Sequence, residues 1–231
     1  MQLNKMNAAL VAAVCAACLA YGPVPSVVGK LKYMTRHDRS KRVIYLTFDD
    51  GPSEFTMELL DLLKEYDIKA SFFMVASFAA EYPEVVKRVQ EEGHLIGLHS
   101  LEHRNAMICS PAYTNRDFLE SMNIFKEMGI VPKYYRPPWG EVNLWSLMNL
   151  SVHGLKKVIW NVMAEDWRGN TTSEIIEEKL LSRTRNGDVV CLHDGRGKDN
   201  APARTIEALR NVLPIWKKRG YEFKLISERK I

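Results

Sequence analysis

The chain has 231 residues, which suits one well-packed domain, and α/β barrels commonly reach this length as single domains. Its hydrophobic and charged fractions, 46% and 26%, are those of a soluble globular protein and exclude a disordered or fibrous chain. The net charge of +4 is spread along the sequence without a dense Lys/Arg stripe, which excludes a nucleic-acid partner and leaves a mildly anionic one at most.

An apolar run at the N-terminus, residues 6–21, predicts a signal peptide or a membrane anchor. Small residues such as Ala20 and Gly22 favour cleavage there, whereas an anchor of about 20 residues needs the proline-containing extension to Val28. The positive-inside rule alone would place the rest of the chain in the cytoplasm, because the segment is followed by Lys30, Lys32, Arg36, Arg39, Lys41 and Arg42. We expect a secreted or membrane-anchored extracytoplasmic protein with its orientation open; a helix on the domain surface is the alternative.

Composition divides the chain into three parts: residues 1–29 as leader or anchor, residues 30–42 as a basic linker, and residues 43–231 as the folded domain. Cys15 and Cys18 lie in the leader, so only Cys109 and Cys191 belong to the domain. Two lone cysteines do not make a disulfide framework, and we interpret both as buried small hydrophobes.

Beyond residue 42, short apolar runs alternate with helical patterns. The runs predict strands at residues 43–48, 70–75, 94–98, 157–162, 188–192 and 222–226, with residues 133–135 leading into a further loop. The helical patterns cover residues 54–66, 82–92, 115–128, 144–152, 173–183 and 204–219. Strands separated by helices pair in parallel through right-handed crossovers. The number of units predicts an α/β fold with a closed or nearly closed β/α barrel, in which functional residues gather at the carboxyl ends of the strands.

Polar residues of functional type follow five of these apolar segments: Asp49 and Asp50, His99, Arg136, Asp166 and His193. His99 and His103, four residues apart, would share one face of a helical turn and bind one metal ion. Adjacent carboxylates on a loop point in different directions, so one aspartate of the Asp49–Asp50 pair would complete the metal site while the other faces the substrate as a base. A helix-capping turn is the alternative interpretation of this pair.

The remaining candidates would support such a site. Arg136, in a loop stiffened by two prolines, would pair with a carboxylate and hold it ionised. A buried Asp166 would raise the pKa of His193 and orient its ring, which makes a better proton donor. Three apolar side chains form either a wall for a small acyl methyl group or ordinary core packing: Trp139, Trp167 and Leu192.

Five ordered motifs resemble those of the polysaccharide deacetylase family, the NodB-homology or carbohydrate esterase 4 group: TFDDGP (47–52), HSxxH (99–103), RPPWG (136–140), DW (166–167) and LH (192–193). The resemblance spans residues 43 to about 226. It implies a distorted β/α barrel that hydrolyses N-acetyl, less often O-acetyl, groups on chitin oligomers, peptidoglycan, xylan or related glycans. Two positions depart from the family pattern: Met163 stands where an earlier Asp of the fourth motif is common, and Trp139 where Tyr is common.

The resemblance also implies roles for individual residues. Asp50, His99 and His103 would bind a divalent metal, usually zinc. Asp49 would act as general base, oriented by Arg136, and His193 as general acid, tuned by Asp166. The backbone N–H of Trp139 would hold the oxyanion. Three other interpretations stay open from the sequence: hydrolysis of an ester instead of an amide, action on a membrane-linked glycolipid, and a non-catalytic carbohydrate-binding relative.

Overall fold

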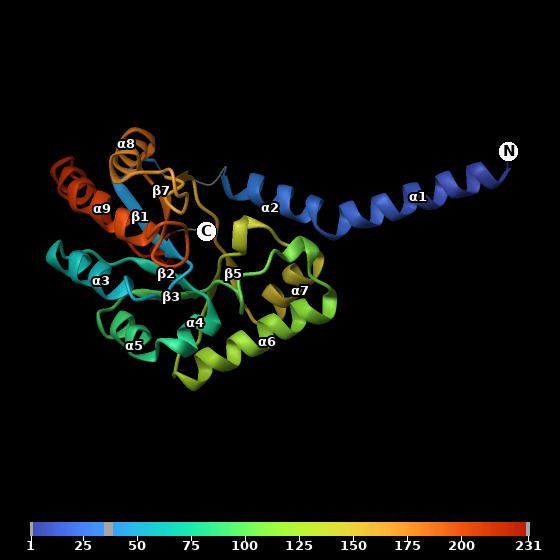
Figure 1. The fold of residues 1–231 in the computed structure, drawn as a ribbon, viewed down its shortest axis with the longest axis horizontal. Helices are drawn as coiled ribbons and strands as arrows, with labels where there is room; N and C mark the ends of the chain where they lie inside the picture. The colour runs from blue at the N-terminus through green and yellow to red at the C-terminus, as the bar shows by residue number, and fades with distance from the viewer. Residues whose placement is uncertain (1, 35–38, 230–231) are drawn as a thin grey trace.

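A computed structural model describes residues 2–34 and 39–229 of the chain, and Arg36 of the basic stretch lies outside these residues (Figure 1). Within the described ranges, eight parallel strands form one sheet in the order β5-β4-β3-β2-β1-β7-β6, and β8 pairs with β1. The strands are β1 (Val43–Asp49), β2 (Ser71–Met74), β3 (Leu95–Leu98), β4 (Tyr134–Tyr135), β5 (Lys156–Lys157), β6 (Val162–Met163), β7 (Asp188–His193) and β8 (Glu222–Phe223).

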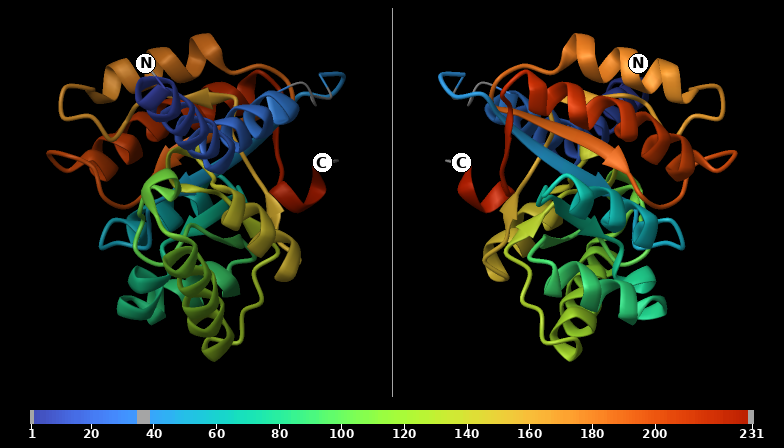
Figure 2. Two further views of the ribbon diagram at one scale, coloured as in Figure 1. Left: turned by 90° about the vertical axis from the view of Figure 1, so that its right-hand side faces the viewer. Right: turned by 90° about the vertical axis from the view of Figure 1, so that its left-hand side faces the viewer.

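Helices pack around the outside of this sheet, where α8, α9, α3, α5, α4 and α6 contact one another in that order (Figure 2). The α-helices are α1 (Gln2–Tyr21), α2 (Pro23–Met34), α3 (Thr56–Glu65), α4 (Ala76–Glu81), α5 (Pro83–Glu91), α6 (Pro111–Glu127), α7 (Leu144–Val152), α8 (Ser173–Arg183) and α9 (Ala201–Lys218). The described residues also include the 3₁₀ turns η1 (Ala106–Ile108), η2 (Pro138–Gly140) and η3 (Ile226–Glu228). The single α/β domain with a curled parallel sheet confirms the predicted fold class.

One predicted strand was wrong. The apolar run 157–162 is divided between two short strands at opposite edges of the sheet, β5 and β6. The N–H of Val158 donates to the carbonyl oxygen of Tyr135 in β4, and the N–H of Asn161 donates to the carbonyl oxygen of Val189 in β7. Residues 158–161 therefore cross the open side of the barrel. They are apolar because Val158 and Ile159 fill its interior together with Phe73, Val189 and Ile226, not because they form a strand.

The N-terminal helices differ in how they meet the domain. α1 projects away from it, whereas α2 lies against it (Figure 1). A stretch of 19 residues, Leu10–Val28, has a mean hydropathy of 1.8 and is long and apolar enough to cross a membrane. Most of this stretch is exposed, although its last residues already lie within α2.

Candidate metal and acid–base site

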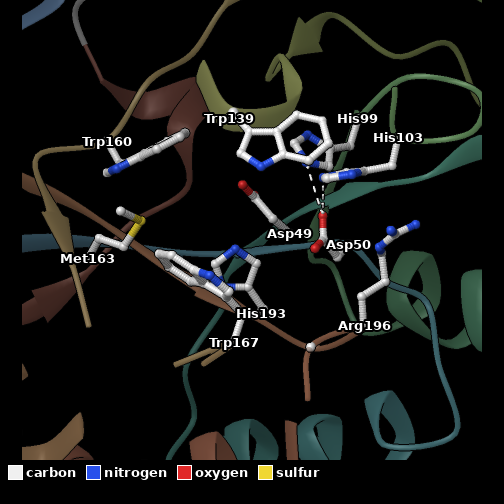
Figure 3. A pocket seen from close by; sticks show the side chains of 11 residues that line it. Asp49, Asp50, His99, His103, Trp139, Trp160, Met163, Trp167, His193 and Arg196 are labelled. Atoms are coloured by element: carbon white, nitrogen blue, oxygen red, sulfur yellow. Dashed lines mark ion pairs between the residues drawn. The ribbon is translucent and has the colours of Figure 1, made fainter. Parts of the chain in front are cut away.

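A cavity of about 290 Å³ opens at the carboxyl ends of the strands (Figure 3). It gathers five of the predicted polar residues, because parallel strands deliver the residues that follow them to one rim. The lining residues are Asp49, Asp50, His99, His103, Trp139, Trp160, Met163, Trp167, His193, Arg196 and Gly197.

Three of these side chains converge on one point. The Nε2 atoms of His99 and His103 lie 3.2 Å and 2.9 Å from Oδ1 of Asp50. The histidines come together on a loop and not on a helical turn, so that part of the prediction was wrong. Asp50 and His103 have left-handed backbone angles, φ 70° and φ 55°. Such angles cost non-glycine residues of order 1–3 kcal/mol and persist where the surroundings enforce them, often at functional sites.

Hydrogen bonding shows that this cluster suits a divalent cation. Nδ1 of His99 lies 2.6 Å from the carbonyl oxygen of Arg136, which only accepts, so Nδ1 carries the proton and Nε2 presents a lone pair. Within the described part of the chain, Oδ1 of Asp50 has no hydrogen-bond donor. A buried carboxylate and two imidazoles thus fit a zinc-type ligand set.

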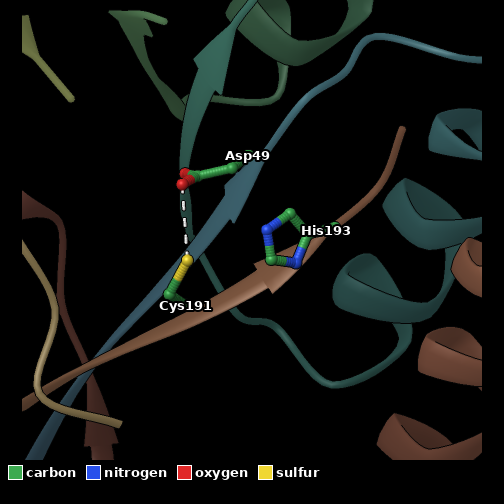
Figure 4. A group of neighbouring side chains, drawn as sticks. All are labelled: Asp49, Cys191 and His193. Atoms are coloured by element: carbon green, nitrogen blue, oxygen red, sulfur yellow. Dashed lines mark hydrogen bonds between the residues drawn. The ribbon is translucent and has the colours of Figure 1, made fainter. Parts of the chain in front are cut away.

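Asp49 is held from two sides by buried donors. Arg136, which is fully buried, donates from one guanidinium nitrogen to Oδ1 of Asp49 and to Oγ1 of Thr47, both at 2.7 Å. The thiol of Cys191, on the neighbouring β7, lies 3.3 Å from Oδ2 (Figure 4). Cys191 is buried as predicted, but it contacts the site. The charge-assisted hydrogen bond from Arg136 therefore fixes the orientation of the Asp49 carboxylate.

His193 stands directly beside Asp49, because the two residues are paired in register across β1 and β7. Its Nδ1 lies 2.9 Å from Oδ1 of the fully buried Asp166, whose Oδ2 accepts from the His193 backbone N–H at 2.8 Å and from the hydroxyl of Thr205 at 2.9 Å. Burial lowers the pKa of His193, but the carboxylates of Asp166, Asp50 and Asp49 outweigh this effect and raise the pKa to about 10. The imidazole is therefore protonated at neutral pH and equipped to donate a proton.

Asp49, Cys191 and His193 also lie close enough to hold an ion. Their bonding argues against this. Burial raises the pKa of the Cys191 thiol well above its usual value, so a thiolate is disfavoured. The charged imidazole of His193 offers no lone pair. The Asp50 cluster is the better metal site.

Sequence reasoning gave no role to Asp194, which is buried and lies near Asp50. Its Oδ2 accepts from the hydroxyl of Thr56 at 2.6 Å, and a side chain at Gly51 would collide with the carboxyl group. Burial raises the pKa of Asp194 to about 7; the nearby Asp50 and Asp49 add to this, and the Thr56 hydroxyl opposes it. The only signal in the sequence was its position after His193.

Apolar side chains complete the cavity, though not quite as predicted. The ring of Trp139 lies 4.5 Å from that of His103, and the ring of Trp167 lies 5.1 Å from that of His193, centroid to centroid. Leu192 points elsewhere: it is fully buried in the main core cluster and does not line the cavity. Trp160, Met163 and Arg196 line the cavity and were not predicted as site residues.

Comparison with known proteins gives consistent matches. Residues 36–158 match the family model described as polysaccharide deacetylase. A peptidoglycan-N-acetylglucosamine deacetylase of Bacillus cereus is 35% identical over 192 residues, covering 82% of this chain and 88% of its own length. A chitooligosaccharide deacetylase of Azorhizobium caulinodans is 32% identical over 211 residues, covering 85% and 97%.

Solved structures of deacetylases and of a carbohydrate esterase are also similar to this chain. The crystal structure of a peptidoglycan N-acetylglucosamine deacetylase in complex with a benzamide derivative superposes with a TM-score of 0.78 at 30% identity, covering 84% of this chain and 90% of that one. A family 4 carbohydrate esterase from Streptomyces lividans, in complex with acetate, gives 0.72 at 30% identity over 80% and 92%.

Proposed function

The chain belongs to the polysaccharide deacetylase family, and we propose that it is a metal-dependent hydrolase that removes N-acetyl groups from an N-acetylated glycan. One observation carries the proposal: the buried, arginine-paired Asp49 and the aspartate-paired His193 lie in register beside three residues that could hold a metal ion, in one cavity. Amide hydrolysis needs a base for water and an acid for the leaving nitrogen.

Asp50, His99 and His103 would hold the metal, for which we propose zinc. Bound zinc lowers the pKa of water to about 7 and polarises a carbonyl group as a Lewis acid. The carbonyl oxygen of Arg136 lies 2.6 Å from Nδ1 of His99. A hydrogen bond of this kind orients a ligating imidazole.

Asp49 is the proposed general base. It takes a proton from the water molecule whose oxygen attacks the acetamide carbon. Arg136 fixes one carboxylate oxygen of Asp49, so the base approaches the water in one orientation. The backbone N–H of Trp139 is the proposed donor to the oxyanion that forms on the former carbonyl oxygen.

His193 is the proposed general acid. As the carbon–nitrogen bond breaks, His193 gives its proton to the leaving nitrogen, and the products are acetate and a free amine. Asp166 keeps Nδ1 of the imidazole occupied at 2.9 Å, so the proton leaves from the other ring nitrogen. Each such acid or base contributes on the order of 10²–10⁴ in rate.

The cavity also bears on the substrate. Met163, Trp160 and Trp167 give it an apolar side that suits an acetyl methyl group. Arg196 lines the same cavity and is exposed. A cation there favours a glycan that carries free carboxylates, as peptidoglycan does on its stem peptides, over neutral chitin oligomers. The B. cereus relative is a peptidoglycan-N-acetylglucosamine deacetylase, and the A. caulinodans relative is a chitooligosaccharide deacetylase.

The test is acetate release by the full chain in detergent from peptidoglycan and from N-acetylglucosamine oligomers. We expect release from zinc-loaded protein, loss after chelation, and recovery when zinc is restored. His103→Ala serves as the metal-site control and should bind less zinc. Zinc binding without acetate release from either glycan would contradict the amidase proposal, and assays on an O-acetylated glycan and a glycolipid would then decide between the alternatives.

A further inference from the structure

The second N-terminal helix, α2, contacts the rim of the cavity. The hydroxyl of Ser26 donates to the carbonyl oxygen of Val142 at 2.7 Å and accepts from the Val142 N–H at 2.9 Å. One side chain thus satisfies both backbone groups of a residue 116 positions away. Ser26 is 4% exposed and Val142 is fully buried, so this is an interior contact. Unpaired buried backbone groups destabilise a fold, and the Ser26 hydroxyl satisfies two of them.

Other contacts hold α2 and the end of α1 to the same region. Lys30 approaches the carbonyl oxygen of Trp139 at 3.3 Å, and its side chain packs beside Gly140. The hydroxyl of Tyr21, the last residue of α1, donates to the carbonyl oxygen of Cys109 at 2.7 Å. Gly22 packs against Met107. The segment from Tyr21 to Lys30 therefore touches two loops: Tyr21 and Gly22 contact the loop around η1, and α2 contacts the loop around η2.

These two loops are tied to each other as well. The side-chain amide of Asn143 donates to the carbonyl oxygen of Ala106 at 2.7 Å and to the hydroxyl of Thr114 at 3.1 Å. Asn105 donates to the carboxylate of Glu141 at 2.7 Å. A shift of α2 would therefore act on the rim as a unit.

The rim needs support because of its conformation. Trp139 has φ 55°, a left-handed angle that a tryptophan adopts only when its surroundings impose it. Its ring contacts the proposed ligand His103. The next residue, Gly140, also has a positive φ of 69°, and a side chain there would press against Lys30 and Trp160.

We propose that α2 is a working part of the active site, with Ser26 and Lys30 as positioning residues that hold the loop carrying Trp139. The boundary expected at residue 29 lies inside α2, so a chain trimmed at the start of the predicted folded domain would lose this support. The apolar α1, with Leu10 64% and Val14 54% exposed, makes no such interior contact along that part. The catalytic consequence rests on the proposed function, whereas the effect on the loop does not.

The experiment compares full-length Ser26→Ala and Lys30→Met with wild type, with Val27→Ala as the matched control. Val27 is on the same helix and 56% exposed, so its loss should change nothing. Hydrogen exchange at residues 138–143 should be about 2–10-fold faster in Ser26→Ala, because the Val142 amide loses its acceptor. Exchange in β1 and β7 should stay unchanged. For acetate release we expect kcat to fall about tenfold at full zinc content, since a 1 Å misplacement costs up to about 10²-fold.

Two results would overturn the proposal. Unchanged exchange at residues 138–143 in both variants would show that α2 does not hold the loop. Faster exchange with wild-type kcat and KM would show that it holds the loop without positioning the site. If the wild-type chain releases no acetate from any glycan, the proposed function fails, but the exchange comparison still decides whether α2 supports the rim.

Discussion

The strand side and the loop side of the cavity are held by different means. On the strand side, Asp49 and His193 end two adjacent strands that pair along six residues, and their partners Arg136 and Asp166 are fully buried. On the loop side, Trp139 is 52% exposed and lies on a short turn whose support comes from α2. Strand pairing already fixes the residues of a central sheet, whereas a loop is held in place by contacts with other segments.

From this difference we expect the two sides to have different roles in the reaction. The strand side carries proton transfer, which depends on the atoms of specific side chains. The loop side offers a backbone N–H and an aromatic surface, for which the position of the chain matters more than the identity of the side chain. Substitutions should therefore be severe on the strand side and mild on the loop side.

The largest effect is expected from Asp49→Asn. The amide retains the size of the carboxylate but cannot take a proton, so kcat should fall by about 10²–10⁴. Zinc content should stay at the wild-type level, because Asp49 is outside the Asp50 cluster. Single-turnover rates and metal analysis measure both quantities. A rate within tenfold of wild type would show that Asp49 is not the base, and that substitutions on the strand side are not more severe than those on the loop side.

Arg136→Met tests the packing of the strand side. The substitution leaves Asp49 buried without its cation, so the free energy of unfolding should fall by about 3–5 kcal/mol, as when one partner of a buried ion pair is removed. Denaturant titration measures the change. Arg136→Lys keeps the charge but not the planar shape of the guanidinium group. Its free energy of unfolding should lie between those of wild type and Arg136→Met. A loss below about 1 kcal/mol would mean that the pair matters little for stability.

Asp166→Asn tests the acid through pH. His193 has a pKa raised from 6.5 to about 10, so its stabilising charge is fully present below pH 6.5 and is lost as the pH rises through 10. Without the Asp166 charge, the imidazole should lose its proton at lower pH. The alkaline limb of the kcat profile should then shift to lower pH, and kcat at pH 8 should fall about 10²-fold, the low end of acid–base effects. A profile between pH 6 and 10 that matches wild type would exclude this coupling.

The strand side was largely predictable from sequence, since polar residues directly after apolar runs must meet at one edge of a parallel sheet. Leu192 shows the limit of that reasoning. Side chains alternate along a strand, so Cys191 and His193 face the site while Leu192 faces the outer helices. Applying this alternation along β7 would have predicted Cys191, not Leu192, as a residue that faces the site.

The remaining features depend on contacts between distant segments. The run 157–162 is apolar for a reason that only the curled sheet reveals, namely that Val158 and Ile159 fill its interior. Ser26 is one polar residue in an otherwise apolar stretch, and its partner Val142 is 116 positions away. No local pattern encodes such a pair, so the supports of the loop side could not be predicted.

The smallest effect is expected from Trp139→Ala. The ring is half exposed in the cavity rim, so its loss should remove a surface on which a sugar ring can stack, worth about 0.5–1.5 kcal/mol. KM for N-acetylglucosamine oligomers should rise about 2–10-fold by the same stacking energy, with kcat nearly unchanged, because the backbone N–H remains. Steady-state kinetics at full zinc content separate the two constants. A hundredfold fall in kcat would show that the side chain itself positions the reacting groups, and the loop side would then have to be counted with the strand side as part of the acid–base machinery.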